Sequence, residues 1–256
     1  MINQLKIKNG LDTEFIGQNV VFEEVTPSTN TLAKENSHMP DGTVFVANAQ
    51  TNGRGRLGRE WASQPDAGIY MSILLKPDIA IKEIPKITLL AGIAGCRVIE
   101  NSKIKYPNDI LIGTKKVSGI LCEMSQDSDG KTFVVCGIGI NVNTKAFDGE
   151  LSQKATSLLI ETGRLHSRVE IIQKFLVEFE KLYCEFLQSG IAPLMSEYKE
   201  KCVNIGAVVR AIYENSEIVG KCVDITPDGA IVVQTKNGTL EINTGDISVR
   251  GIYGYV

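Results

Sequence analysis

Histidine and paired cysteine, two common sources of metal ligands and catalytic groups, are scarce in this chain. Its 256 residues include only two histidines, His38 and His166, each among polar neighbours. This scarcity argues against a Ser-His-Asp triad and against a histidine-ligated metal. The six cysteines are far apart and form no C-x-x-C pair. We therefore expect buried thiols, and neither a metal site nor a dithiol redox motif.

Long apolar runs and excess positive charge are also missing. No stretch approaches the roughly 20 apolar residues of a transmembrane helix, and residues 1–15 lack the apolar core of a signal peptide. A cytoplasmic protein without membrane association is expected. The formal net charge of −3 provides no overall attraction to nucleic acid, so DNA is not an expected partner.

Short β-branched runs and helical periodicity indicate a mixture of strands and helices. Strands are predicted at 20–25, 43–49 and 69–75, and a hairpin is predicted from 117–124 and 132–142. Apolar spacing predicts a buried helix over 85–99. A second helix is predicted from a capping box at Ser167 and Glu170 to Gly190.

Beyond Lys201 the pattern changes to short strands separated by tight turns. The runs are VVRAIY, EIVGKCVDI, GAIVVQT and GTLEIN, and Asn-Ser, Pro-Asp-Gly and Asn-Gly turns lie between them. This pattern predicts a small all-β barrel of about 50 residues. We expect a first domain at 1–202 and a second at 203–256.

The segment QTNGRGRLGREW, from Gln50 to Trp61, is the most informative part of the sequence. It places three glycines and three arginines between residues 53 and 59. Glycine allows close approach of the backbone to a phosphate, and arginine supplies permanently charged donors. The segment predicts an anionic ligand. Its G-x-G-x-x-G spacing also matches a dinucleotide fingerprint, but the residues that follow contain a proline and no helical periodicity, which argues against that fold.

Four further segments carry polar groups or glycines where ligands commonly bind. They are STN at 28–30 before a helical run, KYPND at 105–109, KVSGIL at 116–121 and GIGINV at 137–142. Each has an ordinary structural explanation: a helix cap, a surface turn, a solvated lysine or close packing of strands. None is specific when it is taken alone.

In this order, the five segments closely resemble the biotin protein ligase family over nearly the whole chain. The resemblance is to the monofunctional type without an N-terminal DNA-binding domain. It implies an α+β fold, in which helices cover one face of a mixed sheet in a biotin/lipoate ligase-like catalytic domain, followed by an SH3-like β-barrel. Two positions depart from the family pattern. Tyr106 replaces a common tryptophan, and Leu57 replaces a frequent extra arginine.

The resemblance also implies the reaction and its participants. ATP would activate biotin as biotinyl-5′-AMP, and the biotin would pass to a lysine of a biotin carboxyl carrier protein domain in a biotin-dependent carboxylase. Mg²⁺ would accompany ATP, although no dedicated protein metal site is expected. The protein would act as a monomer or a homodimer.

The same resemblance assigns roles to individual residues. Lys116 would stabilise charge at the biotin carboxylate and the α-phosphate, and Asp109 would orient or deprotonate the incoming lysine amine. With these two, Arg54 and Arg56 form the expected catalytic set. Trp61 would pack on adenine. Biotin contacts are expected from Ser28, Thr29, Asn30, Gln50, Arg54, Gly55, Arg56, Lys116 and Gly119. Adenylate contacts are expected from Arg54, Arg56, Arg59, Trp61, Asn108, Lys116 and Asn141.

Three alternatives remain. A lipoate or octanoate protein ligase would share the catalytic fold, but it usually lacks the arginine-rich loop that ends in tryptophan. A bifunctional ligase and transcriptional repressor would need a helix-turn-helix, and residues 1–19 are too few and lack helical periodicity. A non-catalytic binding module would use the C-terminal barrel, which is only about a fifth of the chain.

Overall fold

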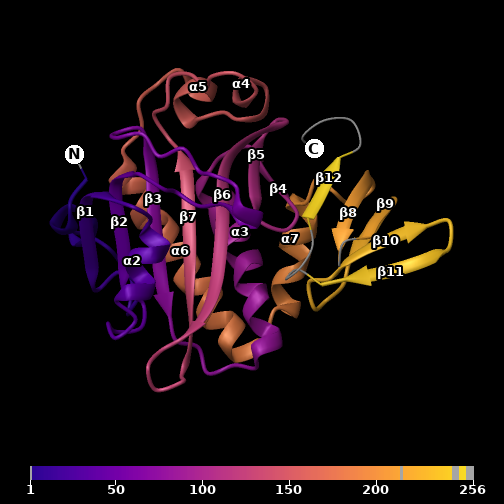
Figure 1. Ribbon diagram of the computed structural model, residues 1–256, viewed down its shortest axis with the longest axis horizontal. Helices are drawn as coiled ribbons and strands as arrows, with labels where there is room; N and C mark the ends of the chain where they lie inside the picture. The colour runs from indigo at the N-terminus through magenta and orange to yellow at the C-terminus, as the bar shows by residue number, and fades with distance from the viewer. Residues whose placement is uncertain (1, 214–215, 244–247, 252–256) are drawn as a thin grey trace.

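The computed structural model describes residues 2–213, 216–243 and 248–251 (Figure 1). Its larger part is built on a seven-stranded sheet with the order β1-β2-β3-β7-β6-β5-β4. Only the β1–β2 pair is parallel among the pairs in this sheet. The strands are β1 (Val20–Thr26), β2 (Val44–Gln50), β3 (Gly68–Leu75), β4 (Ser102–Lys105), β5 (Asp109–Ile112), β6 (Lys115–Gln126) and β7 (Thr132–Asn141). The three single strands and the hairpin predicted from sequence are confirmed.

Helices accompany this sheet on both faces. The α-helices are α1 (Gln4–Lys8), α2 (Thr29–Glu35), α3 (Ile87–Val98), α4 (Leu151–Lys154), α5 (Leu158–Thr162), α6 (Arg168–Ser189) and α7 (Met195–Lys201). Short 3₁₀ turns lie at Arg56–Gly58, Ile81–Lys86 and Ala192–Leu194. The helix predicted over 85–99 begins two residues late, because Pro85 belongs to the 3₁₀ turn that precedes α3. Among these described helices, none combines the length and the apolar character needed to cross a bilayer.

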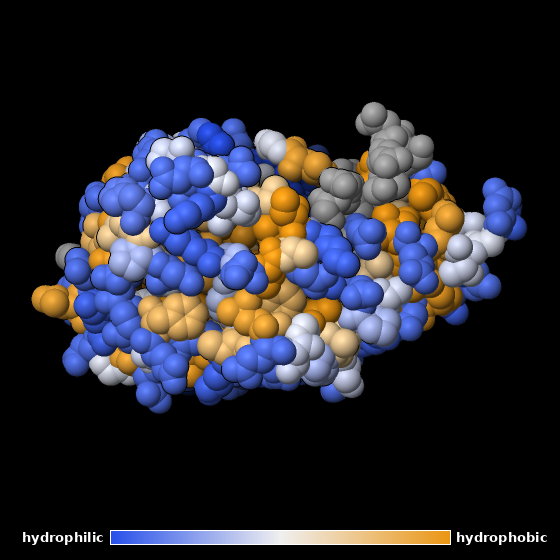
Figure 2. All heavy atoms as spheres, turned by 90° about the horizontal axis from the view of Figure 1, so that it is seen from below, coloured by the Kyte–Doolittle hydropathy of each residue, from blue (hydrophilic) through white to orange (hydrophobic). Residues whose placement is uncertain are grey.

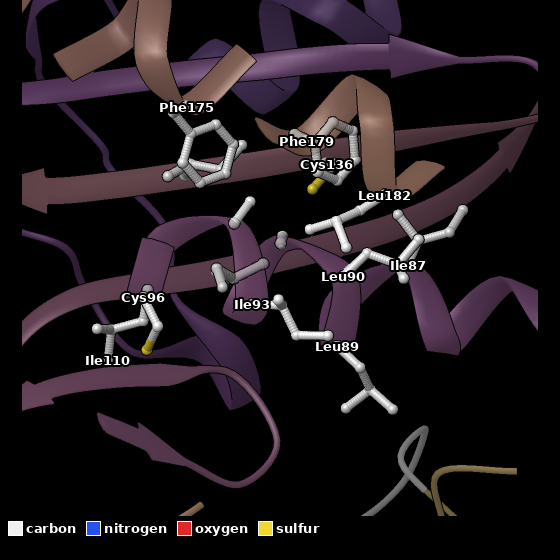
Figure 3. Close-up of a cluster of buried hydrophobic side chains, with 14 of the residues drawn as sticks. Ile87, Leu89, Leu90, Ile93, Cys96, Ile110, Cys136, Phe175, Phe179 and Leu182 are labelled. Carbon is white, nitrogen blue, oxygen red and sulfur yellow. The ribbon is translucent and has the colours of Figure 1, made fainter. Parts of the chain in front are cut away.

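The two long helices, α3 and α6, pack on one face of the sheet and enclose the main core (Figure 3). Ile87, Leu90 and Ile93 of α3 meet Phe175 and Phe179 of α6 beside the central strand β7. The capping box predicted at the start of α6 is present in part, since the hydroxyl of Ser167 accepts the Glu170 N–H at 3.3 Å.

The opposite face of the sheet carries α2. Helices were expected on one face, and α2 is an additional helix on the other. Because strand side chains alternate between faces, Phe45, Leu74 and Val135 point away from the main core and form a second cluster with Ala33 of α2. The same alternation places residues 137, 139 and 141 of β7 on the α2 face. This face therefore holds the glycines that the sequence singled out.

The N-terminal segment is fixed to α6 by a buried carboxylate. Glu180 is only 8% exposed, and its two oxygens accept the backbone N–H groups of Glu14, Phe15 and Ile16 at 2.7, 3.0 and 2.7 Å. Three N–H donors satisfy most of the hydrogen-bonding capacity of a carboxylate, which offsets the cost of burying its charge.

The C-terminal part is a five-stranded antiparallel sheet with the order β11-β10-β9-β8-β12. Its strands are β8 (Val208–Tyr213), β9 (Ser216–Ile225), β10 (Ile231–Thr235), β11 (Gly238–Ile242) and β12 (Ser248–Gly251). The all-β C-terminal unit is confirmed, and β12 was not among the four predicted runs. The predicted Asn-Ser turn includes residue 215, which lies outside the described residues.

The C-terminal sheet shares its core with the larger part. Its buried residues Val209, Cys222 and Ile231 belong to the same contiguous cluster as α3 and α6. Two apolar side chains of its strands face solvent, since Val208 and Val219 are 48% and 50% exposed. Figure 2 views the molecule from below. Apolar residues are visible at this end of the molecule, and polar and apolar residues are mixed over the rest of that face.

Candidate active site

Two neighbouring pockets lie on the α2 face, where the ends of β2, β3, β6 and β7 meet the loop at 53–61. The first is narrow, with a volume of about 50 Å³, which holds only a few water molecules. All nine residues expected to contact biotin line it: Ser28, Thr29, Asn30, Gln50, Arg54, Gly55, Arg56, Lys116 and Gly119.

The inner end of the first pocket is a network of polar groups. Gln50 Oε1 accepts the Thr29 N–H at 2.8 Å, and the Asn30 amide donates to Glu123 Oε2 at 2.7 Å. The buried hydroxyl of Ser72 lies 2.7 Å from Thr29 Oγ1 and 2.6 Å from Asn30 Oδ1. Fixed donors and acceptors of this kind can bind a compact neutral polar group.

Ser72 was missed from the sequence because it lies alone inside an apolar strand. Ser28 is the N-cap residue of α2, but its side chain makes no capping hydrogen bond within the part of the chain described. The STN segment is therefore not explained by helix capping through the Ser28 hydroxyl.

Glycines in β6 and β7 make room for side chains of this same chain. A β-carbon built on Gly139 would lie 2.5 Å from the indole of Trp61, and one on Gly119 would lie 3.0 Å from the same ring. A β-carbon on Gly137 would overlap the side-chain amide of Asn30. Asn30 and Trp61 are therefore among the groups that these glycines admit, and room for biotin beside Gly119 stays a prediction.

A bulge in β6 brings Lys116 to the same face as Gly119. In the pairing with β5, Gly119 lies opposite Asp109 and Ser118 opposite Ile110, but Lys116 lies opposite Leu111, so Val117 is the extra residue. Without the bulge, strand alternation would place residues 116 and 119 on opposite faces.

The second pocket is larger, with a volume of about 770 Å³. It is lined by the loop at 55–62, the segment 105–109, the segment 147–155 and Arg210 of β8. Six of the seven residues expected to contact the adenylate line it. Arg54 is the exception and lines the first pocket. Asp109 also lines the second pocket.

Several basic and apolar residues of the second pocket were missed. One of them, Lys105, belongs to the KYPND segment but was given no role there, and the other three lie outside the five segments and reach the pocket only through the tertiary fold. These residues are Lys105, Phe147, Lys154 and Arg210. Together with the arginines of the loop, the cations give this pocket the charge needed for a phosphorylated ligand.

Gly55, Arg56, Trp61, Asn108 and Lys116 line both pockets and form the partition between them. The Lys116 ammonium lies 2.5 Å from Asp109 Oδ1 and 5.2 Å from the centroid of the Trp61 ring. The Arg56 guanidinium donates to Asn108 Oδ1 at 3.3 Å.

Burial shapes the electrostatics of this partition. It lowers the pKa of the Arg56 guanidinium, and the nearby Asp109 carboxylate opposes this effect. Arginine starts from so high a pKa that it stays charged at neutral pH. The Trp61 Nε1 is buried without a hydrogen-bond partner among the residues that the structure describes.

The loop at 53–59 is folded back on itself. Its backbone is closed by bonds from the Gly55 N–H to the Arg59 carbonyl at 2.7 Å and from the Trp61 N–H to the Gly53 carbonyl at 2.9 Å. Leu57 is the one large apolar side chain between residues 53 and 59, but it is 69% exposed and has a positive φ of 56°, so the anchor is Trp61 at the end of the loop.

Comparison with known proteins identifies relatives over most of the chain. Residues 22–141 match the Biotin/lipoate A/B protein ligase family, and residues 205–250 match the Biotin protein ligase C terminal domain. A bifunctional ligase/repressor BirA of Bacillus spizizenii is 39% identical over 97% of this chain and 79% of its own length.

A biotin acetyl-CoA-carboxylase ligase of Mycobacterium tuberculosis is 31% identical over 81% of this chain and 79% of its own length. Among solved structures, the biotin protein ligase of Aquifex aeolicus in complex with biotin and ATP superposes with a TM-score of 0.83 at 32% identity. That match covers 91% of this chain and 99% of the Aquifex chain.

Proposed function

Because this chain belongs to the biotin protein ligase family, we propose that its two pockets bind biotin and ATP and join them as biotinyl-5′-AMP. The biotin then passes to a lysine of an acceptor protein. The Bacillus relative is named a ligase and a repressor, and both families matched here are ligase domains. The ligase half of that name is the one that these residues support.

The observation that carries this proposal is the partition between the pockets. The inner end of the first pocket offers fixed neutral donors and acceptors, which suit the ureido ring of biotin. The second offers cations, which suit the phosphates of ATP. Lys116 and Arg56 lie where a carboxylate from one side meets a phosphate from the other.

The first half-reaction follows from this arrangement. A carboxylate oxygen of biotin attacks the α-phosphorus of ATP, the new P–O bond forms, and the bond to the bridging oxygen breaks and releases pyrophosphate. Negative charge grows on the oxygens around phosphorus. We assign its stabilisation to Lys116 and Arg56, which are held in place by Asp109 and Asn108 before the ligand arrives.

The second half-reaction uses the same place. The acceptor amine attacks the carbonyl carbon of the mixed anhydride, the C–O bond to AMP breaks, AMP leaves as the phosphate anion, and the proton of the amine passes to Asp109 as general base. Asp109 lies at the edge of the second pocket and can accept a hydrogen bond from the amine once a phosphate engages Lys116.

Magnesium would accompany the nucleotide. Among the described residues no three His, Cys, Asp or Glu side chains are grouped to hold a metal ion. Asp109 and Glu60 are the carboxylates of the second pocket. A bound Mg²⁺ would thus take most of its ligands from phosphate oxygens and water, and it would neutralise charge on the leaving pyrophosphate.

The acceptor is proposed to be a biotin carboxyl carrier protein domain, and the reaction is placed in the cytoplasm, where ATP is available. We also propose that the catalytic domain ends at residue 202 and that the C-terminal domain spans 203–256. The change to an all-β pattern after α7 supports this boundary.

The function is tested by biotin-dependent exchange of labelled pyrophosphate into ATP. We expect exchange with biotin and none with lipoate or octanoate at equal concentration. Exchange that depends on lipoate or octanoate instead of biotin would move the protein to the lipoate ligase branch of the fold.

Removing the Ser72 hydroxyl should weaken biotin binding without stopping the chemistry. Thr29 and Asn30 each lose a short contact in the Ser72→Ala variant, and one hydrogen bond contributes roughly 0.5–1.5 kcal/mol. We expect the KM for biotin to rise about 2- to 10-fold while kcat changes little.

Ser102→Ala is the matched control for Ser72→Ala. Ser102 is also a buried serine of this sheet, but its hydroxyl donates to the Ile99 carbonyl at 2.6 Å, away from the pockets. Equal KM values in wild type, Ser72→Ala and Ser102→Ala would remove Ser72 from the biotin site.

A further inference from the structure

Tyr106 links the active-site segment to the C-terminal part of the chain. It lies between β4 and β5 and is 1% exposed. Its backbone N–H donates to Asn204 Oδ1 at 2.7 Å, and its hydroxyl donates to the Gly229 carbonyl at 3.0 Å. Burial raises the pKa of the Tyr106 phenol far above its usual value, so the hydroxyl keeps its proton and remains a donor.

The residues next to Tyr106 are held from the same side. The Val203 N–H donates to the Ile104 carbonyl at 2.9 Å, and the Tyr198 hydroxyl donates to the Pro107 carbonyl at 3.3 Å. The chain from α7 onward therefore forms hydrogen bonds with the segment 104–107 at several points. Asn108 and Asp109 follow this segment directly.

These next two residues face the other way, into the site. Asn108 accepts from Arg56 and donates to the Ile120 carbonyl at 2.9 Å, and Asp109 pairs with Lys116. The same five-residue segment thus contacts the C-terminal part through Tyr106 and the partition between the pockets through Asn108 and Asp109.

The turn that accepts the Tyr106 hydroxyl is itself fixed. The Thr226 hydroxyl accepts the Ala230 N–H at 3.1 Å across the β9–β10 turn. Lys86 pairs with Asp228 at 3.0 Å. Gly229 has a φ of 84°, and a β-carbon there would lie 2.5 Å from Leu89 of α3. The Gly229 carbonyl that accepts the Tyr106 hydroxyl therefore belongs to a turn that is held in place by its own contacts.

We propose that Tyr106 is a positioning residue through which the β9–β10 turn of the C-terminal sheet sets the places of Asn108 and Asp109. The proposal rests on the proposed function. It gives the C-terminal sheet a role in the chemistry through one hydroxyl. Tyr106 lines the second pocket, but its hydroxyl bonds to Gly229, which does not line either pocket.

The test is Tyr106→Phe in the full-length chain, because phenylalanine keeps the ring and removes only the hydroxyl. Small displacements of reacting groups are costly in catalysis, so we expect kcat to fall about tenfold in pyrophosphate exchange and in transfer to a recombinant carrier domain. The KM for biotin should stay within about twofold, because the first pocket's polar end lies on α2, β2 and β3.

Two further variants locate the effect. Thr226→Val loosens the turn from the other side and should lower kcat in the same direction, with a double variant no worse than the stronger single one. Lys199→Met removes the 2.8 Å pair with Asp224, which joins α7 to β9 of the C-terminal sheet and not to the segment 105–109. It should leave kcat unchanged.

An unchanged kcat in Tyr106→Phe overturns the proposal. So does a loss in Lys199→Met equal to that in Tyr106→Phe, because the effect would then come from general docking of the sheet. A rise in KM for biotin that matches the fall in kcat also overturns it, since the damage would not be confined to the partition. Failure of the proposed function is distinct, because wild-type protein would then show no biotin-dependent exchange.

Discussion

Replacing Lys116 with alanine should reduce biotinyl-adenylate formation by about 10²–10³-fold, the loss typical when one transition-state donor is removed. Lys116 is fixed by Asp109 at 2.5 Å and by the Trp61 ring, so its charge is oriented before the substrates arrive. Alanine leaves the developing charge on phosphorus with Arg56 as its neighbouring cation. The loss should appear in kcat of biotin-dependent pyrophosphate exchange, with the thermal midpoint measured alongside.

Lys115→Ala is the matched control. Lys115 is the preceding residue of β6, but its ammonium donates to the Ser152 carbonyl at 2.9 Å and lines neither pocket. Removing this neighbouring charge should leave exchange near the wild-type rate. Exchange in Lys116→Ala within a few-fold of Lys115→Ala would sink the assigned role of Lys116.

Arg56→Gly should release biotinyl-adenylate into solution about 10- to 100-fold faster than the wild type does. The variant loses a largely buried cation that bonds to Asn108, and a hydrogen bond of a charged group contributes roughly 1.5–3 kcal/mol. Synthesis should fall less than retention, because Lys116 remains. The measurement is the dissociation rate of preformed adenylate, together with limited proteolysis of the loop with and without biotin.

Leu57→Gly separates the lost contact from added backbone freedom. Leu57 is exposed and already has a positive φ, which glycine adopts without strain. It therefore adds the same freedom to the loop without removing a charge, and its release rate should match the wild type. Equal release rates for Arg56→Gly and the wild type, or loop cleavage unaffected by biotin, would mean that the loop is a rigid turn.

The narrow first pocket supports a moving loop. Its volume of about 50 Å³ is too small for a bicyclic acid, and Trp61 and Lys116 are two of the side chains that fill the remaining space. Both belong to the partition, and Trp61 closes the loop. We therefore expect the end of the loop to shift when a ligand enters, and the bound ligand would then be covered by the same residues.

Local signals in the sequence were sufficient for most elements. Alternating β-branched runs predicted β1, β2, β3 and the β6–β7 hairpin, because each strand buries a face that periodicity reveals. The α2 face was not foreseen, since a seven-residue helix has too few turns to show which way it packs. The strand β12 was also missed. It has only four residues.

In the site, too, local signals in the sequence predicted one part and tertiary structure determines the rest. Its glycines, arginines and amides could be chosen from motifs, but their meeting depends on long-range geometry. The bulge at Val117 turns Lys116 toward Gly119, and nothing in the local sequence predicts it. Arg210 reaches the second pocket from a strand that lies 55 to 155 residues further along the chain than the segments that line the pocket with it.

The boundary between residues 202 and 203 was predicted from the change in composition. Composition does not show whether the two parts have separate hydrophobic cores. The buried residues of the C-terminal sheet form one cluster with α3 and α6, so cutting the chain there would expose apolar surface on both pieces. Point variants such as Tyr106→Phe therefore give a cleaner test of the C-terminal sheet than its deletion.

The hydrogen bonds of the Glu180 carboxylate can form only late in synthesis of the chain. The three N–H groups that this carboxylate accepts lie 164 to 166 residues earlier in the chain, so they leave the ribosome long before their acceptor does. At a synthesis rate of roughly 5–20 residues per second, the interval is about 10 to 30 s. Throughout that time the N–H groups of residues 14–16 lack this acceptor. A nascent chain stalled before α6 would therefore present residues 14–16 to chaperones and proteases, even though β1, β2 and β3 had already been made.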